Sequence, residues 1–277
     1  MSPVPTVAAI ITFHSDDRFF PEALRSVLEQ THPPDEIVVV DDASPSGTNR
    51  SLEGLDPRVR VIRHEVNRGA GAARQTGADA TTSELLAYLD ADDVWQPNKL
   101  RRQLESLAAN PDLAAHHVGL VAFRADGTET AYTAKPQLLG LADELRRNHA
   151  LPSAYLIRRS ALAAVGGWRR DNAVMEDWDL NIRVVAAGLK VGFLAEELVR
   201  FRRTDHGNLS ARGLRHMMIN LKTIWAHRRL YREVLGLGTT AAVVGRVVHH
   251  EGSRRGRASG LLLRGVGRLL GYPAAYQ

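Results

Sequence analysis

The chain of 277 residues contains no cysteine and has few acidic residues in its last third. The lack of cysteine excludes disulfides and thiolate metal sites, so nothing argues for an oxidising compartment. No apolar run approaches the roughly 18 to 20 residues that a membrane-spanning helix needs. The first residues lack a basic segment followed by a small-residue cleavage site, so we expect no signal peptide. With its alanine- and arginine-rich composition, the chain fits a bacterial cytoplasmic protein.

Charge is distributed unevenly along the chain. Residues 1–199 carry 21 basic and 28 acidic residues, whereas residues 200–277 carry 15 basic and 3 acidic residues. A basic end indicates a polyanionic partner, an anionic membrane surface or simply a solvated face. The length allows one large domain, or one domain with an appendage.

Apolar runs that read as strands alternate with amphipathic, helix-like runs through the first half of the chain. Strands are predicted at 6–13, 36–42, 58–64, 84–90 and 114–123, and helices at 21–31, 69–81 and 97–110. This alternation predicts an α/β fold with a mostly parallel sheet and helices on both faces. Further along, we expect a strand, a short helix and a turn at 151–168, a helix at 176–190, strands at 191–203 and basic helices from 213.

Polar side chains follow three of the predicted strands at the points where those strands end. They lie at Thr12–His14, at Asp41–Asp42 and at Asp90, Asp92 and Asp93. In open α/β sheets, ligands bind outside the carboxyl ends of the strands. Three close carboxylates repel one another unless a cation compensates, and Mg²⁺ and Mn²⁺ prefer oxygen ligands. The cluster suits a metal–diphosphate site; an acidic loop that caps the following helix is the alternative, and Asp-x-Asp alone does not separate the two.

Five segments in a fixed order resemble the family 2 glycosyltransferases of the GT-A fold: "IITFH", "EIVVVDDASPSGT", "NRGAGAARQTGADAT", "AYLDADDVWQPNKL" and "GGWRRDNAVMEDWDL". The resemblance covers about residues 5–210. It implies a Rossmann-like nucleotide-diphospho-sugar transferase fold over residues 1–212. The nucleotide-binding half would take about 1–123 and the acceptor half about 124–212. Residues 213–277 would be a basic helical extension.

The resemblance implies a set of donor-binding residues. Thr12 and His14 would line the nucleoside pocket, and Asp41 would accept a hydrogen bond from the base, such as uracil N3–H. Asp42 would hold the loop. The segment "DDASPSG" is typical of a turn, so one of its aspartates would bond only nearby backbone amides. Arg74 would reach the base or the diphosphate, whereas the small residues around it are explained by a helix that packs on a sheet.

The resemblance also implies a metal site for Mn²⁺ or Mg²⁺. Asp92 would be the main ligand, and Asp90 would contact the ribose or a metal-bound water. Asp93 would assist or cap the helix. His206 would be a third metal ligand or a phosphate contact, and it is equally well explained as a surface loop residue. The cation would bridge the diphosphate and neutralise charge on the leaving group.

The segment "MEDWDL" resembles the Glu-Asp motif on the acceptor side of the family. Asp177 would be the general base that removes a proton from the acceptor hydroxyl, which implies a single displacement with inversion. Acidic residues are also favoured at a helix N-terminus by the helix dipole, and Glu176 and Asp179 satisfy that explanation as well. Trp168 and Trp178 would stack on a sugar face or lie in the core, which is the commoner place for aromatic residues.

We therefore expect an inverting, metal-dependent glycosyltransferase that uses a nucleotide-diphosphate sugar, with UDP as the expected nucleotide. The acceptor would be a saccharide, a lipid-linked saccharide or a small metabolite. One alternative is a sugar-nucleotide nucleotidyltransferase, which would want a glycine-rich, basic loop where this chain has "HSDDRFF". Another is a non-catalytic module that binds a nucleotide sugar or a membrane surface. We expect no nucleic-acid partner, because the basic end has few interleaved aromatic residues.

Residues 213–277 match no family pattern. Apolar residues recur in them at roughly helical spacing. These helices would pack on the catalytic domain or pair with a second copy of the chain. The other hypothesis is contact with anionic lipid, which would place the protein peripherally at the inner face of the membrane.

Overall fold

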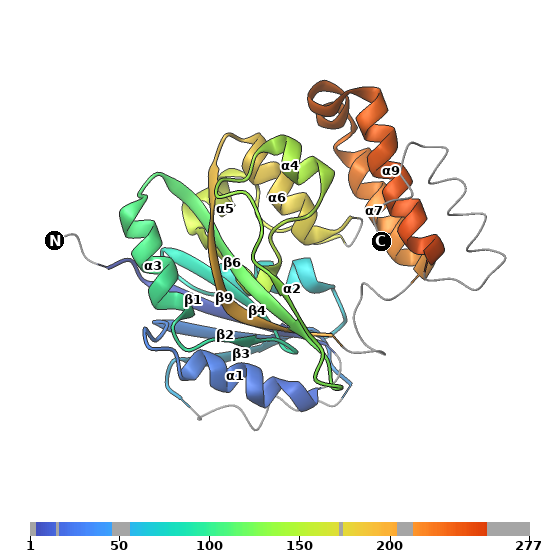
Figure 1. The fold of residues 1–277 in the computed structure, drawn as a ribbon. Helices are drawn as coiled ribbons and strands as arrows, with labels where there is room; N and C mark the ends of the chain where they lie inside the picture. Colours follow the sequence, from blue (N-terminus) through green and yellow to red (C-terminus); the bar gives the residue numbers. More distant parts are fainter. Residues whose placement is uncertain (1–3, 15–16, 46–55, 172–173, 204–212, 254–277) are drawn as a thin grey trace. The chain divides into compact units, whose positions relative to one another are not determined.

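A computed structural model describes residues 4–14, 17–45, 56–171, 174–203 and 213–253 (Figure 1). The chain forms two compact units. The first unit comprises Met1–Gly140, Asn148–Asn172 and Glu176–Arg203, and the second comprises Leu141–Arg147, Ala173–Met175 and Thr204–Gln277. In this division, the C-terminal segment of the second unit starts at residue 204. The predicted boundary at residue 212 remains a prediction.

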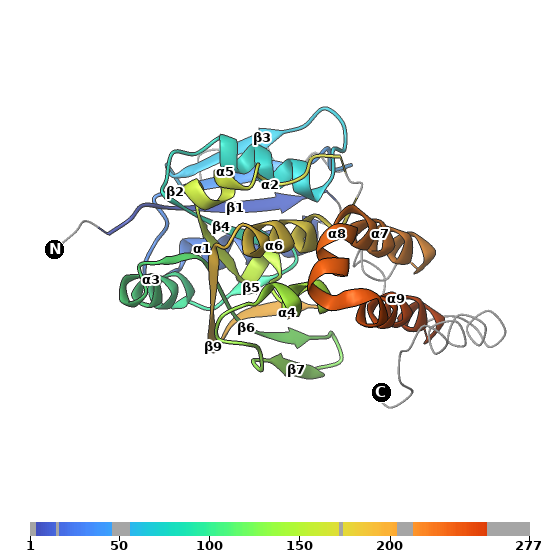
Figure 2. The ribbon, with the colours of Figure 1, turned by 90° about the horizontal axis from the view of Figure 1, so that it is seen from above.

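The first unit is built on a mixed nine-stranded sheet in the described part of the chain. Its parallel half has the order β3-β2-β1-β4, which Figure 2 shows side by side. Two helices connect these strands, and a short 3-10 turn, η1 (Asp17–Phe19), leads into the first of them. The bounds are β1 (Val7–Phe13), α1 (Phe20–Leu28), β2 (Glu36–Asp41), β3 (Val59–Arg63), α2 (Ala70–Asp79) and β4 (Leu85–Asp90).

The other half of the sheet contains antiparallel pairs, where the sequence predicted mostly parallel pairing. Strand β8 (Tyr155–Arg158) runs antiparallel to both β4 and β6 (Leu113–Phe123). Strand β9 (Lys190–Arg202) lies parallel to β6 and pairs with the short β5 (Val94–Trp95), while β7 (Glu129–Tyr132) extends the other edge of β6. Apolar periodicity reports which residues are buried and not which way a strand runs, so this half could not be read from the sequence.

Alternate residues of the central strands face two different helix layers. In β1, Val7, Ala9 and Ile11 belong to the cluster that includes apolar side chains of α1 and α3 (Lys99–Ala109). Ala8 and Ile10 belong to the cluster beneath α5 (Arg159–Ala164) and α6 (Glu176–Ala186). Both faces are apolar, because a strand with helices on each side has no solvated face.

Two glycines allow helix α2 to lie close to its neighbours. A Cβ atom at Gly77 would lie 2.3 Å from Cγ2 of Ile10, and one at Gly71 would lie 2.1 Å from the carbonyl oxygen of Arg169. The small residues in this segment are therefore required by packing within the protein.

The second unit consists of helices. They are α4 (Leu141–Arg146), α7 (Gly213–Ala226), α8 (Arg228–Leu230), the π-helical segment η5 (Tyr231–Leu235) and α9 (Gly236–Ser253). Its buried apolar side chains include Met217, Ile224, Tyr231, Val243 and Val248. Within the residues that the structure describes, none of the helices combines the length and the apolar character needed to cross a bilayer.

Candidate active site

The carboxyl ends of the parallel strands bring the predicted donor-side residues to one edge of the sheet. The register places Thr12 beside Asp90 and Phe13 beside Asp41. The Thr12 side chain is largely buried, at 8% exposure. The next residue along, His14, places Nδ1 2.6 Å from the backbone oxygen of Asp42. Because a carbonyl oxygen only accepts, Nδ1 carries the proton and Nε2 is left for a ligand.

Asp41 holds the end of β2 and the turn that follows it. Its Oδ1 accepts a hydrogen bond from the Ser44 amide at 2.7 Å, and its Oδ2 pairs with the Arg63 guanidinium. The Asp41 side chain is fully buried. Both carboxylate oxygens therefore have protein partners, and a nucleobase would have to share them.

Asp42 organises the loop that leads into α2. Its carboxylate accepts hydrogen bonds from Nδ1 of His64 at 2.7 Å, from the Arg68 amide at 2.8 Å and from the Gly69 amide at 2.7 Å. Gly69 has a φ of +89°, which favours glycine. These contacts are structural, but they join Asp42 to residues 22 to 27 positions away, whereas the local turn bond to the Ser44 amide is made by Asp41.

The three carboxylates after β4 have three different surroundings. Asp93 is buried and accepts from Oγ of Ser153 at 2.5 Å and from the Arg202 amide at 2.9 Å. Burial and the neighbouring Asp92 and Asp90 raise the pKa of Asp93 well above its usual value. This residue therefore ties the Asp-x-Asp turn to η3 (Pro152–Ala154) and β9.

Asp90 and Asp92 remain partly accessible. The side chain of Asp90 is 31% exposed and accepts a hydrogen bond from Arg74. Burial and the charge of Asp90 raise the pKa of Asp92 to about 6, although its own backbone amide and Arg202 favour the charged form. The raised pKa of Asp92 shows that the positive charges of Arg202 and Arg74 only partly offset its burial and the charge of Asp90.

Arg74 joins the end of β4 to helix α6. Its guanidinium donates to Oδ1 of Asp90 at 2.6 Å and to Oε1 of Glu176 at 2.9 Å, and its Cζ lies 5.1 Å from the Trp168 ring centroid. The side chain is only 5% exposed. Burial alone would lower the pKa of Arg74, but Asp90 and Glu176 raise it above its usual value. A buried cation held by two carboxylates fixes the distance between β4 and α6.

Asp177 lies in the first turn of α6, largely buried at 7% exposure. Its Oδ2 accepts from Nδ2 of Asn148 at 2.8 Å and its Oδ1 accepts from the Trp178 amide at 2.7 Å. Asn148 is held in turn by Nδ2 of Asn181, which donates to its Oδ1 at 2.9 Å.

The electrostatic surroundings make Asp177 a weaker acid than a typical aspartate. Burial and the adjacent Glu176 raise the pKa of Asp177 to about 7, against the opposing effects of Arg74, the Trp178 amide and Asn148. A carboxylate with a pKa near the working pH is suited to general-base catalysis. The neighbouring Asp179 differs, because it is fully buried and accepts from Nε of Arg169 and of Arg183 at 2.9 and 2.8 Å. Asp179 therefore serves structure.

Comparison with known proteins shows the family and the fold. The model of the family described as glycosyl transferase family 2 matches residues 8–165, more than half of the chain. The chain belongs to glycosyltransferase family 2. Its fold resembles the GT-A structure of S. aureus TarS 1–349 in complex with UDP-GlcNAc, with a TM-score of 0.66 and 14% identity over 98% of this chain and 94% of that one.

Curated relatives in this family align with part of the chain. The putative teichuronic acid biosynthesis glycosyltransferase TuaG of Bacillus subtilis is 36% identical over 104 residues, 36% of this chain and 41% of TuaG. The Escherichia coli UDP-Glc:alpha-D-GlcNAc-diphosphoundecaprenol beta-1,3-glucosyltransferase WfgD is 32% identical over 105 residues, 38% of this chain and 42% of WfgD. The chain thus spans less than half the length of these relatives.

The residues present fit the divalent cation that this family generally uses. Asp90 and Asp92 supply accessible carboxylate oxygens, the ligands that Mg²⁺ and Mn²⁺ prefer, and Mg²⁺ typically takes its remaining ligands from substrate phosphates and water. Within the described part of the chain, no group of three or more histidine, cysteine or acidic side chains is arranged to hold a metal ion. The predicted ligand His206 lies outside the described residues.

Three contacts at this candidate site were not predicted from the sequence. They are the pairing of Glu176 with Arg74, the hydrogen bond from Asn148 to Asp177, and the bond from Ser153 to Asp93. Each joins residues at least 29 positions apart, so no local pattern predicts it. Trp168 and Trp178 are both 3% exposed. Both tryptophans therefore lie in the core, which was one of the two predicted places; the other was stacking on a sugar face.

Proposed function

We propose that this chain transfers a sugar from a nucleotide-diphosphate sugar, with UDP as the nucleotide, to an acceptor hydroxyl with inversion at the anomeric carbon. The observation that carries the proposal is the Arg74 bridge. It links Asp90, at the Asp-x-Asp turn, to Glu176, which directly precedes the candidate base Asp177. A donor-side carboxylate and an acceptor-side base are thus held in one site within the first unit.

In the proposed reaction, Asp177 removes the proton from the acceptor hydroxyl as its oxygen attacks the anomeric carbon. The pKa of about 7 makes the carboxylate a stronger base than an ordinary aspartate while it remains substantially ionised at neutral pH. Asn148 and the Trp178 amide orient its two oxygens. The bond to the diphosphate breaks on the opposite face of the sugar, so one displacement gives inversion.

On the donor side, we assign the nucleoside pocket to Thr12, His14 and Asp41. The strand register supports this assignment, because it places Thr12 and Asp41 on the same edge as Asp90. Arg74 supplies a positive charge at that edge. Its guanidinium donates to Asp90 and Glu176, so we assign it no direct contact with the diphosphate.

Asp92, together with Asp90, would hold Mn²⁺ or Mg²⁺, and we keep His206 as a further candidate ligand. When bound, the cation would stabilise the negative charge that develops on the leaving diphosphate. The chain's own contribution is to hold the turn: Asp93, Ser153 and Arg202 fix its backbone so that the Asp92 carboxylate stays at the edge of the sheet.

For the acceptor, we propose a saccharide or a lipid-linked saccharide in polysaccharide biosynthesis. The names of the relatives TuaG and WfgD support this class, since one refers to teichuronic acid biosynthesis and the other to a diphosphoundecaprenol-linked sugar. A lipid-linked acceptor would place the protein in the bacterial cytoplasm, at the inner face of the membrane. We also keep residues 1–212 as the catalytic domain.

The test is a transfer assay with a panel of UDP-sugars and Mn²⁺, using Asp177→Asn. Loss of the base should lower kcat by about 10²- to 10⁴-fold while UDP affinity stays within twofold. Asp171→Asn, at an exposed acidic side chain in the same unit, is the matched control and should transfer normally. Normal transfer by Asp177→Asn would remove the base assignment. Failure of every UDP-sugar with the wild-type protein would remove the proposed donor.

A further inference from the structure

Helix α7 of the second unit exposes a line of large apolar side chains. Leu214, Met218 and Trp225 are 48%, 49% and 68% exposed, and Leu221 lies between them with partial exposure. These positions are separated by four, three and four residues, which places them on one face of a helix.

The same helix has a second apolar face that is already used. Met217 and Ile224 are 9% and 6% exposed, and the buried Thr223 accepts from the Met175 amide at 2.9 Å and donates to the Ile219 carbonyl. That face accounts for the packing of α7 in its own unit. The exposed line is therefore additional apolar surface that packing of the described residues does not require.

Basic side chains border the exposed line. Arg215 and Lys222 are exposed on α7, and Arg228 lies over the Trp225 ring with Cζ 4.8 Å from its centroid. Glu233 is the one acidic residue in the described stretch 213–249. An apolar line with a basic border is the pattern of a helix that lies in the interface of an anionic membrane.

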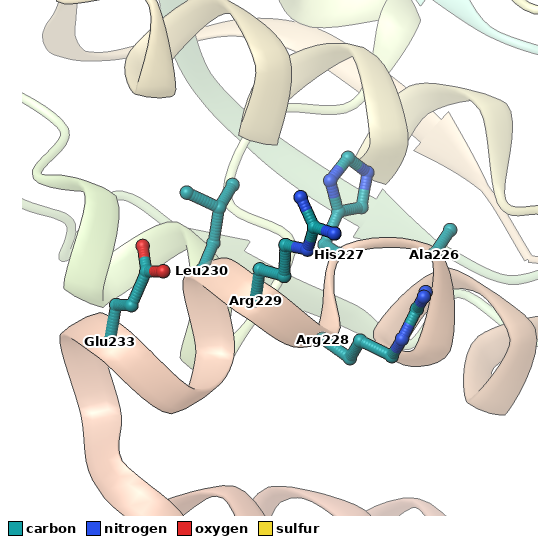
Figure 3. A pocket seen from close by; sticks show the side chains of 6 residues that line it. All are labelled: Ala226, His227, Arg228, Arg229, Leu230 and Glu233. Carbon is teal, nitrogen blue, oxygen red and sulfur yellow. The ribbon is translucent and has the colours of Figure 1, made fainter.

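A pocket continues this surface from α7 into η5. Its volume is about 610 Å³, and its lining is formed by Ala226, His227, Arg228, Arg229, Leu230 and Glu233. Figure 3 shows Arg229, Leu230 and Glu233 pointing to the same side of the chain. The guanidinium groups of Arg228 and Arg229 at this pocket can donate hydrogen bonds to a phosphate headgroup. The carboxylate of Glu233 limits the positively charged part of the lining to these two arginines.

We propose that the face formed by Leu214, Met218, Trp225, Arg228 and Arg229 docks on an anionic lipid surface. It gives a physical basis to the inner-membrane location proposed above, and it does not depend on the transfer reaction. Charge complementarity selects this occupant. A second copy of the chain would bring the same basic border against itself, and nucleic acid would meet Trp225 as the single aromatic residue on the face.

The test is flotation of the full chain with vesicles of phosphatidylcholine alone and with 30% phosphatidylglycerol. The wild-type protein should float with the anionic vesicles and not with the neutral ones, and NaCl should weaken binding. Arg228→Gln with Arg229→Gln should weaken it by about fivefold for each charge. Trp225→Gln should weaken it about tenfold or more, because it removes an inserted aromatic side chain.

Matched controls come from the first unit. Val66→Gln replaces a side chain that is 66% exposed, and Arg60→Gln with Arg124→Gln removes two exposed charges. These variants should float like the wild-type protein. Unchanged thermal melting of each variant shows that it remains folded.

Three outcomes would overturn the proposal. The first is equal flotation of the Trp225 and arginine variants with the wild-type protein. The second is a concentration-dependent dimer in sedimentation that Trp225→Gln abolishes, with no vesicle binding. The third is binding to single-stranded RNA with higher affinity than to anionic vesicles. UDP binding, measured in parallel, reports on the proposed transferase site separately.

Discussion

Replacing Asn148 with alanine should shift the pH dependence of transfer toward higher pH. Asn148 donates to the Asp177 carboxylate at 2.8 Å, and this contact favours the ionised form. A hydrogen bond to a charged group contributes about 1.5–3 kcal/mol, and one pKa unit corresponds to about 1.36 kcal/mol. The pKa of Asp177 should therefore rise by about one to two units from its value of about 7.

The expected loss of activity follows from the ionised fraction. At pH 7 that fraction would fall from about one half to between about 1% and 10%, so kcat/KM should drop by roughly fivefold to fiftyfold. Activity should recover as the pH is raised toward 9. The assay is kcat/KM for transfer from UDP-sugar between pH 5.5 and 9.5. Asn110→Ala, at an exposed asparagine that bonds to the Ser106 carbonyl, is the control.

Glu176→Gln should shift the pH dependence of transfer in the opposite direction, toward lower pH. Glu176 raises the pKa of Asp177, so its neutralisation should move the acidic limb of the profile to lower pH. A loss that is equal at every pH in both variants would refute the reasoning, because it would show that neither contact acts through the charge of Asp177.

Three other predictions concern the metal, the bridge and the core. Mn²⁺ should raise the melting temperature of the wild-type protein and not that of Asp92→Asn, and EDTA should abolish transfer. Arg74→Gln should destabilise the protein by about 1.5–3 kcal/mol in urea unfolding, because it removes the charge-assisted hydrogen bonds to two partly exposed carboxylates. Lys99→Met should raise the free energy of unfolding by at most about 1 kcal/mol at pH 7. Removal of a fully buried amine, whose pKa burial lowers, is offset by the loss of its 2.8 Å bond to Oε1 of the buried Gln103 and of its contact with the Trp95 ring. That gain should shrink as the pH rises toward the usual lysine pKa, since the unfolded chain then loses its proton too.

Three strands of the parallel half, β1, β2 and β4, could be predicted from the sequence because they are buried on both faces and form short continuous apolar runs, whereas β3 is partly exposed and alternates. The runs at 6–13, 36–42 and 84–90 became β1, β2 and β4 with bounds that differ by a residue. The predicted meeting of Thr12, Asp41 and Asp90 then follows from strand order alone. In the other half, the predicted strands at 114–123, within 151–168 and at 191–203 correspond to β6, β8 and β9, but their pairing directions were not predicted. Strands β5 and β7 were also missed, because β5 has two residues and β7 is mostly exposed.

The candidate site was only partly predictable for a related reason. The acidic residues could be located, but their partners could not. Asp93 and Asp92 are adjacent in sequence, yet the first is bound to Ser153 and Arg202 while the second remains at the accessible edge. Which carboxylate serves structure depends on contacts 60 and 109 residues away. Residue chemistry alone did not distinguish Asp92 from Asp93, and the metal-ligand role of Asp92 stays a prediction from the family resemblance.

The Arg74 bridge limits how the chain can be recombined with its relatives. Two of its three members come from the half that we assign to the donor, and Glu176 comes from the half that we assign to the acceptor. A chimaera that exchanges the acceptor half to change specificity would inherit a buried guanidinium with one counter-charge missing, unless the incoming segment also has a carboxylate at position 176. Designers of such hybrids should choose parents by that position before they choose a crossover point.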